Sequence, residues 1–132
     1  MNEVEPLRDA LSFDASRVNV VLFSQPGCEF CAEERQNYLK PLAAMRNRDL
    51  VVSEVELEAS KPMRDWSGHL VTQSEFAKSN RARFAPTVMF FDARGRTVAD
   101  PIVGLSRDFF GMYLEQRIAL ALRAVPRIDS FR

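Results

Sequence analysis

The chain contains only two cysteines, Cys28 and Cys31, and they form a Cys-x-x-Cys motif. An apolar run over residues 18–23 and a breaker with Pro and Gly over residues 24–27 precede the motif. This order places the motif where a buried strand gives way to a helix. A thiol there faces the free N–H groups and the positive end of the helix dipole, which favour the reactive thiolate. The motif therefore predicts a dithiol–disulfide active site.

Length and composition describe an ordinary soluble domain. The chain has 132 residues, enough for a single domain over 1–132 to bury a core. Hydrophobic residues make up 46% and charged residues 27%, as is usual for globular proteins. The 18 basic and 18 acidic residues give a formal net charge of zero, and they form no basic stripe. We therefore expect no nucleic-acid partner. No apolar stretch is long enough to span a bilayer.

Periodicity and turn residues predict the element order α-β-α-β-α-β-β-α. The expected helices cover residues 3–13, 29–46, 72 to about 79 or 81, and 106 to about 124. The expected strands cover residues 18–24, 50–57, 87–91 and 96–103. The early strands are joined through helices and should be parallel, whereas the last two form an antiparallel hairpin. The predicted fold class is α/β, with a mixed four-stranded sheet and helices on both faces.

Finer features of these elements carry expectations of their own. Pro41 should kink the helix over 29–46. Alternation predicts a half-exposed strand over 50–57, and residues 58–71 read as a long loop. Five phenylalanines in and around the last two expected strands read as core side chains: Phe84, Phe90, Phe91, Phe109 and Phe110.

The elements and motifs together resemble the thioredoxin superfamily. The resemblance rests on the strand before the Cys-x-x-Cys, on Ala85-Pro86-Thr87, on the hairpin over 91–97 and on residues 103–106. It covers about residues 17–124. Within the superfamily, the motif and the long segment after the second strand look most like bacterial periplasmic thioredoxins of the SoxS/SoxW kind.

The resemblance assigns roles to the motif residues. Cys28 would be the nucleophile that attacks a substrate disulfide, and Cys31 would resolve the mixed disulfide. Pro86 would follow a cis peptide bond and lie against the cysteine pair. Ala85 would offer its backbone to an extended substrate segment. Gly104 would keep that surface open, although it also reads as a simple turn glycine.

The residues between the cysteines should tune the site. A carboxylate on Glu29, next to the nucleophile, disfavours the thiolate and predicts a comparatively reducing couple. Phe30 is expected to be exposed and to contact an apolar protein surface. Glu33 and Glu34 either add negative charge to the site or form a solvated helix face.

One departure from the family concerns proton transfer. Thioredoxins carry a buried Asp on the strand six residues before the first cysteine, and this chain has Leu22 there. The carboxylate that usually moves protons to and from the second cysteine is therefore missing. The sequence does not identify a general base in its place.

These observations predict a thiol–disulfide oxidoreductase, most consistent with a reductase of protein disulfides. No cofactor is expected beyond the cysteine pair. A zinc site is disfavoured because tetrahedral zinc needs four ligands, and the chain offers two cysteines and His69. The alternatives are a reductase in cytochrome c maturation, a disulfide isomerase and, in another class, a redox-sensing binding module.

The cellular setting follows from the resemblance alone. It implies a monomer that is reduced by a membrane electron-transfer protein and serves a sulfur-oxidation system in the periplasm. The acidic N-terminus lacks the basic and apolar regions of a signal peptide. The chain is therefore either a mature periplasmic form or a cytoplasmic protein.

Overall fold

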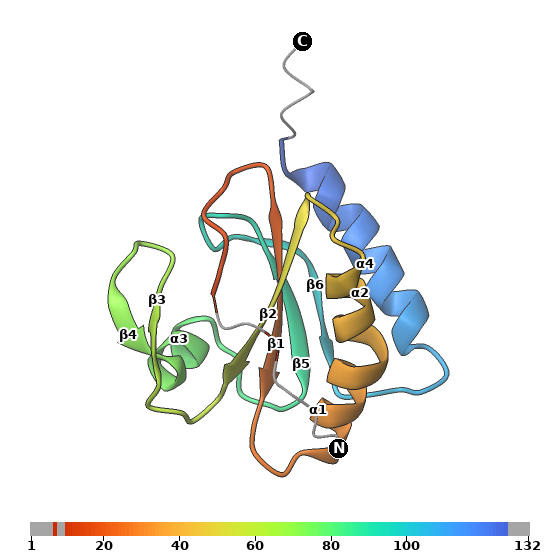
Figure 1. The fold of residues 1–132 in the computed structure, drawn as a ribbon, viewed down its shortest axis with the longest axis horizontal. Helices are drawn as coiled ribbons and strands as arrows, with labels where there is room; N and C mark the ends of the chain where they lie inside the picture. Colours follow the sequence, from red (N-terminus) through yellow and green to blue (C-terminus); the bar gives the residue numbers. More distant parts are fainter. Residues whose placement is uncertain (1–6, 8–9, 127–132) are drawn as a thin grey trace.

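A computed structural model describes residue 7 and residues 10–126 of the chain. Its elements run in the order β1 to α4, with one π-helical segment, η1, between two helices (Figure 1). The strands are β1 Val18–Ser24, β2 Leu50–Glu56, β3 Pro62–Arg64, β4 Leu70–Thr72, β5 Thr87–Phe91 and β6 Thr97–Val103. The helical segments are α1 Glu29–Glu34, η1 Arg35–Leu39, α2 Lys40–Ala44, α3 Gln73–Ser79 and α4 Phe110–Ala124.

Four strands form the main sheet in the order β2-β1-β5-β6. β1 is parallel to β2 and antiparallel to β5, and β6 is antiparallel to β5. The α1-η1-α2 segment and α4 lie on one side of this sheet, and α3 lies on the other (Figure 1). The mixed four-stranded sheet with helices on both faces is confirmed.

Side chains of β1 alternate between two cores, one on each face of the sheet. Val20 and Leu22 belong to the core under α4, whereas Val21 and Phe23 belong to the core under α3. All of β1 is buried, as expected for a central strand that is covered on both faces. The central strand that leads to Cys28 is therefore held from both sides.

The helix expected over 29–46 is divided rather than simply kinked. The π-helical turn of η1 precedes Pro41, which occupies the first turn of α2. Proline has no N–H to donate and clashes with the preceding turn of a regular helix. A wider turn before it relieves both problems, and such turns are often found at functional sites.

Three expectations about the fold are wrong. β2 is buried along most of its length rather than half-exposed. The loop expected over 58–71 contains the β3–β4 hairpin. Of the helix expected over 3–13, residues 1–6 and 8–9 lie outside the described residues, and the others are not helical. The segment instead contacts β1, because the backbone of Ser12 exchanges two hydrogen bonds with the Asn19 side chain.

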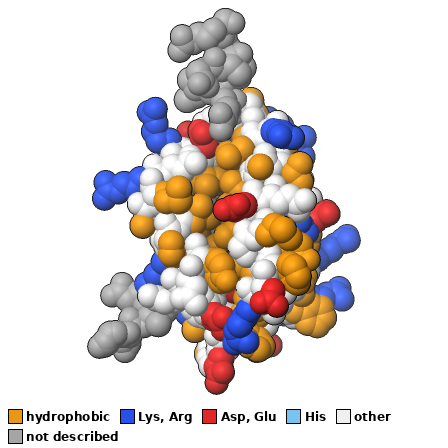
Figure 2. All heavy atoms as spheres, turned by 90° about the vertical axis from the view of Figure 1, so that its right-hand side faces the viewer, with side chains coloured by type: hydrophobic (Ala, Val, Ile, Leu, Met, Phe, Trp, Pro, Cys, Tyr) orange, Lys and Arg blue, Asp and Glu red, His pale blue; other side chains and the backbone are white. Residues whose placement is uncertain are grey.

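The face that carries α2 and α4 exposes several large hydrophobic side chains. Figure 2 shows this side of the molecule, with hydrophobic side chains spread between charged ones. Such side chains on α2 and α4 and at their ends include Met45, Phe109, Met112, Tyr113 and Leu120. No helix in the described part of the chain is long and apolar enough to cross a membrane.

Candidate active site

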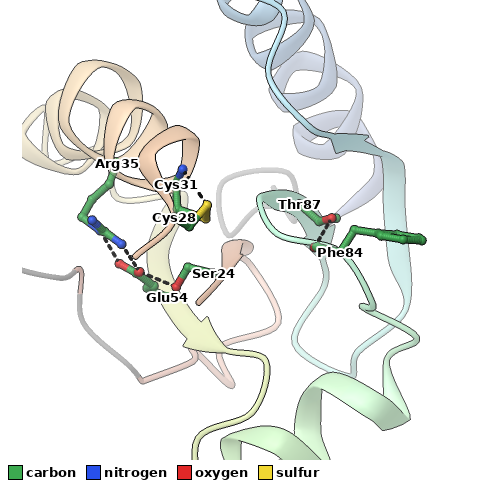
Figure 3. Close-up of a disulfide and its surroundings, with 7 residues drawn as sticks. All are labelled: Ser24, Cys28, Cys31, Arg35, Glu54, Phe84 and Thr87. Carbon is green, nitrogen blue, oxygen red and sulfur yellow. Dashed lines mark hydrogen bonds and ion pairs between the residues drawn. A yellow bond between two sulfur atoms is a disulfide. The ribbon is translucent and has the colours of Figure 1, made fainter. Parts of the chain in front are cut away.

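The two cysteines lie where β1 passes into α1, as the motif predicted. Cys28 is the N-cap residue of α1, and its Sγ accepts a hydrogen bond from the Cys31 N–H at 3.1 Å. The two cysteines form a disulfide with their Cα atoms 5.2 Å apart (Figure 3). Cys28 is half-buried, whereas Cys31 is fully buried. The pair thus has one sulfur at the surface and one beneath it.

The sheet brings the segment around Pro86 to the same end of the molecule. Phe23 on β1 pairs with Thr87 on β5, so the strand leading to Cys28 lies beside the residue that follows Pro86. The Ala85–Pro86 peptide bond is cis. Pro86 is buried, and its carbonyl accepts a hydrogen bond from the N–H of Gly104 at 2.8 Å.

The backbone conformation at position 104 accounts for the glycine there. Its φ is +78°, a region that side chains disfavour. A Cβ at this position would meet no atom within 4 Å, so the space above Gly104 is open. The turn therefore requires a glycine at this position, and the absence of a side chain also leaves the surface open.

Two phenylalanines near the disulfide are exposed. Phe30 is 48% exposed, as expected. Phe84, in the surroundings of the disulfide, is 68% exposed, so its expected place in the core is wrong (Figure 3). Its loop is fixed through the backbone, because the Thr87 hydroxyl donates to the Phe84 carbonyl at 2.7 Å. The same expectation is wrong for Phe109, which is 49% exposed.

The loop before α4 contacts α1 through Arg107. Its guanidinium donates two hydrogen bonds of 2.9 Å to the Glu33 carboxylate. It also lies 5.6 Å from the centre of the Phe30 ring. The pair is at the surface, and the hydrogen bonds to Glu33 raise the pKa of Arg107. Glu33 thus holds this loop beside the motif.

A buried ion pair on the other side of the motif joins the helix to the sheet. Arg35 on η1 donates two hydrogen bonds, of 2.8 and 2.6 Å, to the carboxylate of Glu54 on β2. The Ser24 hydroxyl donates a third, at 2.6 Å (Figure 3). Arg35 and Glu54 also line a hollow of about 440 Å³ that Cys28 borders.

The ion pair fixes the protonation state of both partners. Burial raises the pKa of Glu54, but hydrogen bonds from Arg35 and Ser24 outweigh it, so the pKa lies below its usual value. The hydrogen bonds to Glu54 raise the pKa of Arg35. Both groups are therefore charged at neutral pH.

Glu34 differs from its neighbours on the helix. It is 0% exposed, so of the two alternatives for Glu33 and Glu34 the solvated helix face is wrong for Glu34. Neither of its carboxylate oxygens has a hydrogen-bond partner among the described residues. Burial, and then the charge of Glu33, raise the pKa of Glu34 to about 8. A mostly neutral carboxyl group is the result at neutral pH.

Sequence reasoning missed the roles of Glu54 and Glu34. A signal for Glu54 existed, because it is an acidic residue within an otherwise largely apolar strand. For Glu34 the signal is its spacing of three residues from Cys31, which places both on one helix face. The signal for Glu54 does not reveal its partner, because Arg35 is distant from Glu54 in sequence.

Trp66 and His69, both in the segment over 58–71, lie outside this arrangement. Trp66 anchors the β3–β4 hairpin by packing on Phe76 and Phe91 and by donating to Asn80 at 3.1 Å. His69 is exposed in the same hairpin. Within the described residues, no group of three or more His, Cys, Asp or Glu side chains could hold a metal ion.

Comparison with known proteins identifies the family. A family model described as a thioredoxin-like domain matches residues 14–110. No curated protein matches the chain by sequence. Several solved structures share the fold. Thioredoxin O2 from Arabidopsis thaliana is 19% identical with a TM-score of 0.53, and the match covers 78% of this chain and 76% of that one.

Two bacterial structures are similar to the same extent. The periplasmic thioredoxin SoxS from Paracoccus pantotrophus is 19% identical with a TM-score of 0.52, covering 80% of this chain and 99% of that one. A thioredoxin-fold protein from Helicobacter pylori is 17% identical with a TM-score of 0.55, covering 83% and 81%. These likenesses show the fold alone. The family match shows that the chain belongs to the thioredoxin-like family, and with the Cys28–Cys31 disulfide it identifies the chain as a thiol–disulfide oxidoreductase.

Proposed function

We propose that this protein reduces disulfides of other proteins through Cys28 and Cys31. The observation that carries the proposal is the asymmetry of the pair: Cys28 reaches the surface at a helix N-cap, and Cys31 is fully buried behind it. A nucleophile must reach a substrate sulfur, whereas a resolving thiol must reach only its neighbour. Cys28 is therefore the nucleophile and Cys31 the resolving thiol.

The substrate contacts the backbone and side chains around the pair. No hydrogen bond within the described chain uses the peptide groups of half-buried Ala85. They remain available to an extended substrate segment that adds like a strand. Pro86 and Gly104 shape the surface beside it, and Phe30 offers an apolar contact. A protein segment fits this open surface better than a small molecule does.

The direction of electron flow follows from charge. Glu29 is exposed next to Cys28, and its carboxylate disfavours the thiolate. Strong oxidants of this chemistry owe their potential to a stabilised reduced form. The pair is therefore a reducing couple, and it needs no metal or organic cofactor.

The fold similarity to SoxS supports a setting for this chemistry. The protein acts as a monomeric, single-domain reductase in the periplasm, where it serves a sulfur-oxidation system. Its substrate there is a partner protein with a reactive cysteine, and a membrane electron-transfer protein re-reduces it. Reduction of apocytochrome c is the alternative task of the same chemistry.

Single-cysteine variants test the chemistry. With a reduced protein and a disulfide-containing substrate such as insulin, the wild type should turn over. Cys31→Ser should instead accumulate a mixed disulfide through Cys28, seen as a mass shift that a thiol reverses. Cys28→Ser should form none. Equal trapping by both variants would refute the assigned roles. A double variant with full biological function would indicate a binding module instead.

A further inference from the structure

Glu34 is the buried carboxyl group of α1 that the disulfide chemistry described so far does not use. Its side chain is 0% exposed, and both oxygens lack a partner among the described residues. Native structures satisfy most buried polar groups, so an unsatisfied one calls for an explanation such as a catalytic role. Its raised pKa, about 8, allows it to gain or lose a proton near neutral pH.

The position of Glu34 relates it to Cys31. The two residues are three apart on α1, and both are fully buried. Residues at this spacing have Cβ atoms about 5–6 Å apart on one face of the helix. Long helical side chains lean back toward the helix N-terminus. Helix geometry therefore places the Glu34 carboxyl on the helix face that carries Cys31, directed back toward the turn of α1 that holds this cysteine.

Other charged groups around the helix are already engaged. Glu33 is paired with Arg107 from the loop before α4. Arg35 is paired with Glu54 on β2, whose lowered pKa keeps it ionised. On β1, the side chain facing the same layer is the apolar Leu22. Of these groups in the described chain, only Glu34 is both buried and free to exchange a proton.

The buried thiol requires such a group. Cys31 must lose a proton before it can attack, and burial in apolar surroundings raises the pKa of a thiol. We propose that Glu34 accepts the proton of the Cys31 thiol when the mixed disulfide is resolved. The proposal rests on the proposed function and supplies the proton acceptor that Leu22 cannot provide.

The step balances in atoms and electrons. In the fraction of molecules in which Glu34 is ionised, its carboxylate takes the proton of the Cys31 thiol, giving a carboxylic acid and a thiolate. The Cys31 sulfur then attacks the Cys28 sulfur, forming the intramolecular disulfide and breaking the bond between Cys28 and the substrate. The electron pair of that bond leaves on the substrate sulfur. A dithiol reductant returns the two electrons, and Glu34 returns its proton to Cys31.

Reaction with the aromatic disulfide DTNB separates the two steps. Reduced protein releases one thionitrobenzoate when Cys28 attacks and a second when Cys31 resolves the adduct. In stopped-flow measurements, Glu34→Gln should leave the first release unchanged and slow the second by roughly 10²-fold near neutral pH. The pH profile of the second release should also move to higher pH, because the thiol must then ionise unaided.

Matched variants separate proton transfer from packing. Glu115→Gln makes the same change at an exposed position of α4 and should resolve at the wild-type rate. Glu34→Asp keeps a carboxylate and should recover part of the loss, whereas Glu34→Leu should not. Wild-type resolution with an unchanged pH profile in both Glu34→Gln and Glu34→Leu would overturn the proposal alone. Absence of the first release in the wild type would overturn the proposed function as well.

Discussion

Two buried glutamates on the same side of the sheet behave in opposite ways. Glu54 is 4% exposed and accepts hydrogen bonds from Arg35 and Ser24. Glu34 is 0% exposed and has no partner in the described chain. The pKa of Glu54 is accordingly lowered, and that of Glu34 is raised to about 8. Burial alone does not set the role of a carboxyl group, because its partners decide whether it holds a charge or exchanges a proton.

The two groups also serve the site differently. Glu54 fixes the helix that carries the cysteines against β2, through an arginine four residues after Cys31. Glu34 contributes no such contact, and its burial is a cost to stability. Groups with strongly perturbed pKa values cluster at functional sites, and Glu34 follows Cys31 by three residues on the same helix.

The largest expected effect on the free energy of unfolding comes from breaking the buried ion pair of Arg35 and Glu54. Glu54→Leu leaves Arg35 largely buried without its partner, and such losses cost about 3–5 kcal/mol. We expect a decrease toward the lower end of that range, because the arginine can turn toward solvent. Urea unfolding followed by Trp66 fluorescence measures it. The double variant Glu54→Leu, Arg35→Met should lose less than the sum of the single changes. An additive result would show that the pair is not coupled.

The raised pKa of Glu34 should make the free energy of unfolding depend on pH. Below about pH 4.5 the Glu34 carboxyl is protonated in both the folded and the unfolded protein, so its contribution to the free energy of unfolding is fully present. As the pH rises toward 8, the unfolded state releases this proton while the folded state keeps it, so the free energy of unfolding falls. The slope is at most about 1.4 kcal/mol per pH unit.

Unfolding curves between pH 5 and about 8 measure this slope. Glu34→Gln removes the titrating group and should flatten the dependence. It should also make the variant more stable than the wild type at the upper end of the range, because the wild-type carboxyl resists ionisation there. The same slope in Glu34→Gln would assign the pH dependence to other groups.

The smallest expected effect on the free energy of unfolding concerns the ion pair of Glu33 and Arg107, which lies at the surface. Glu33 and Arg107 form a bidentate pair at the surface, where salt and water weaken it. Arg107→Gln should lower the free energy of unfolding by less than about 1 kcal/mol. Thermal unfolding at low and high salt tests this, since added salt should reduce the difference. A loss as large as that of Glu54→Leu would remove the contrast between surface and buried pairs.

The sequence was sufficient for the fold and the cysteine pair, because local signals determine both. A strand, a breaker and a Cys-x-x-Cys motif place Cys28 at a helix start, and the structure has it there. The start of α3 is likewise set locally, because Thr72 and Glu75 form a capping box with both of its hydrogen bonds.

Features that depend on distant contacts could not be predicted in this way. The burial of β2 depends on what covers it, and alternation in the sequence does not report that. Glu34 reads as one more charge on an acidic helix, because the sequence does not show which helix face meets the sheet. Phe84 reads as core by its hydrophobicity, but its position in the loop before the cis bond leaves it exposed.

The reduction potential of the Cys28–Cys31 pair tests the central claim most directly. Equilibrating the protein with glutathione or dithiothreitol buffers, and counting free thiols, gives the value. A reductase should lie near the thioredoxin value of about −270 mV. A potential near −120 mV, as in a strong oxidant, would contradict the assigned direction and the argument from Glu29. No reversible couple at all would contradict the redox function itself.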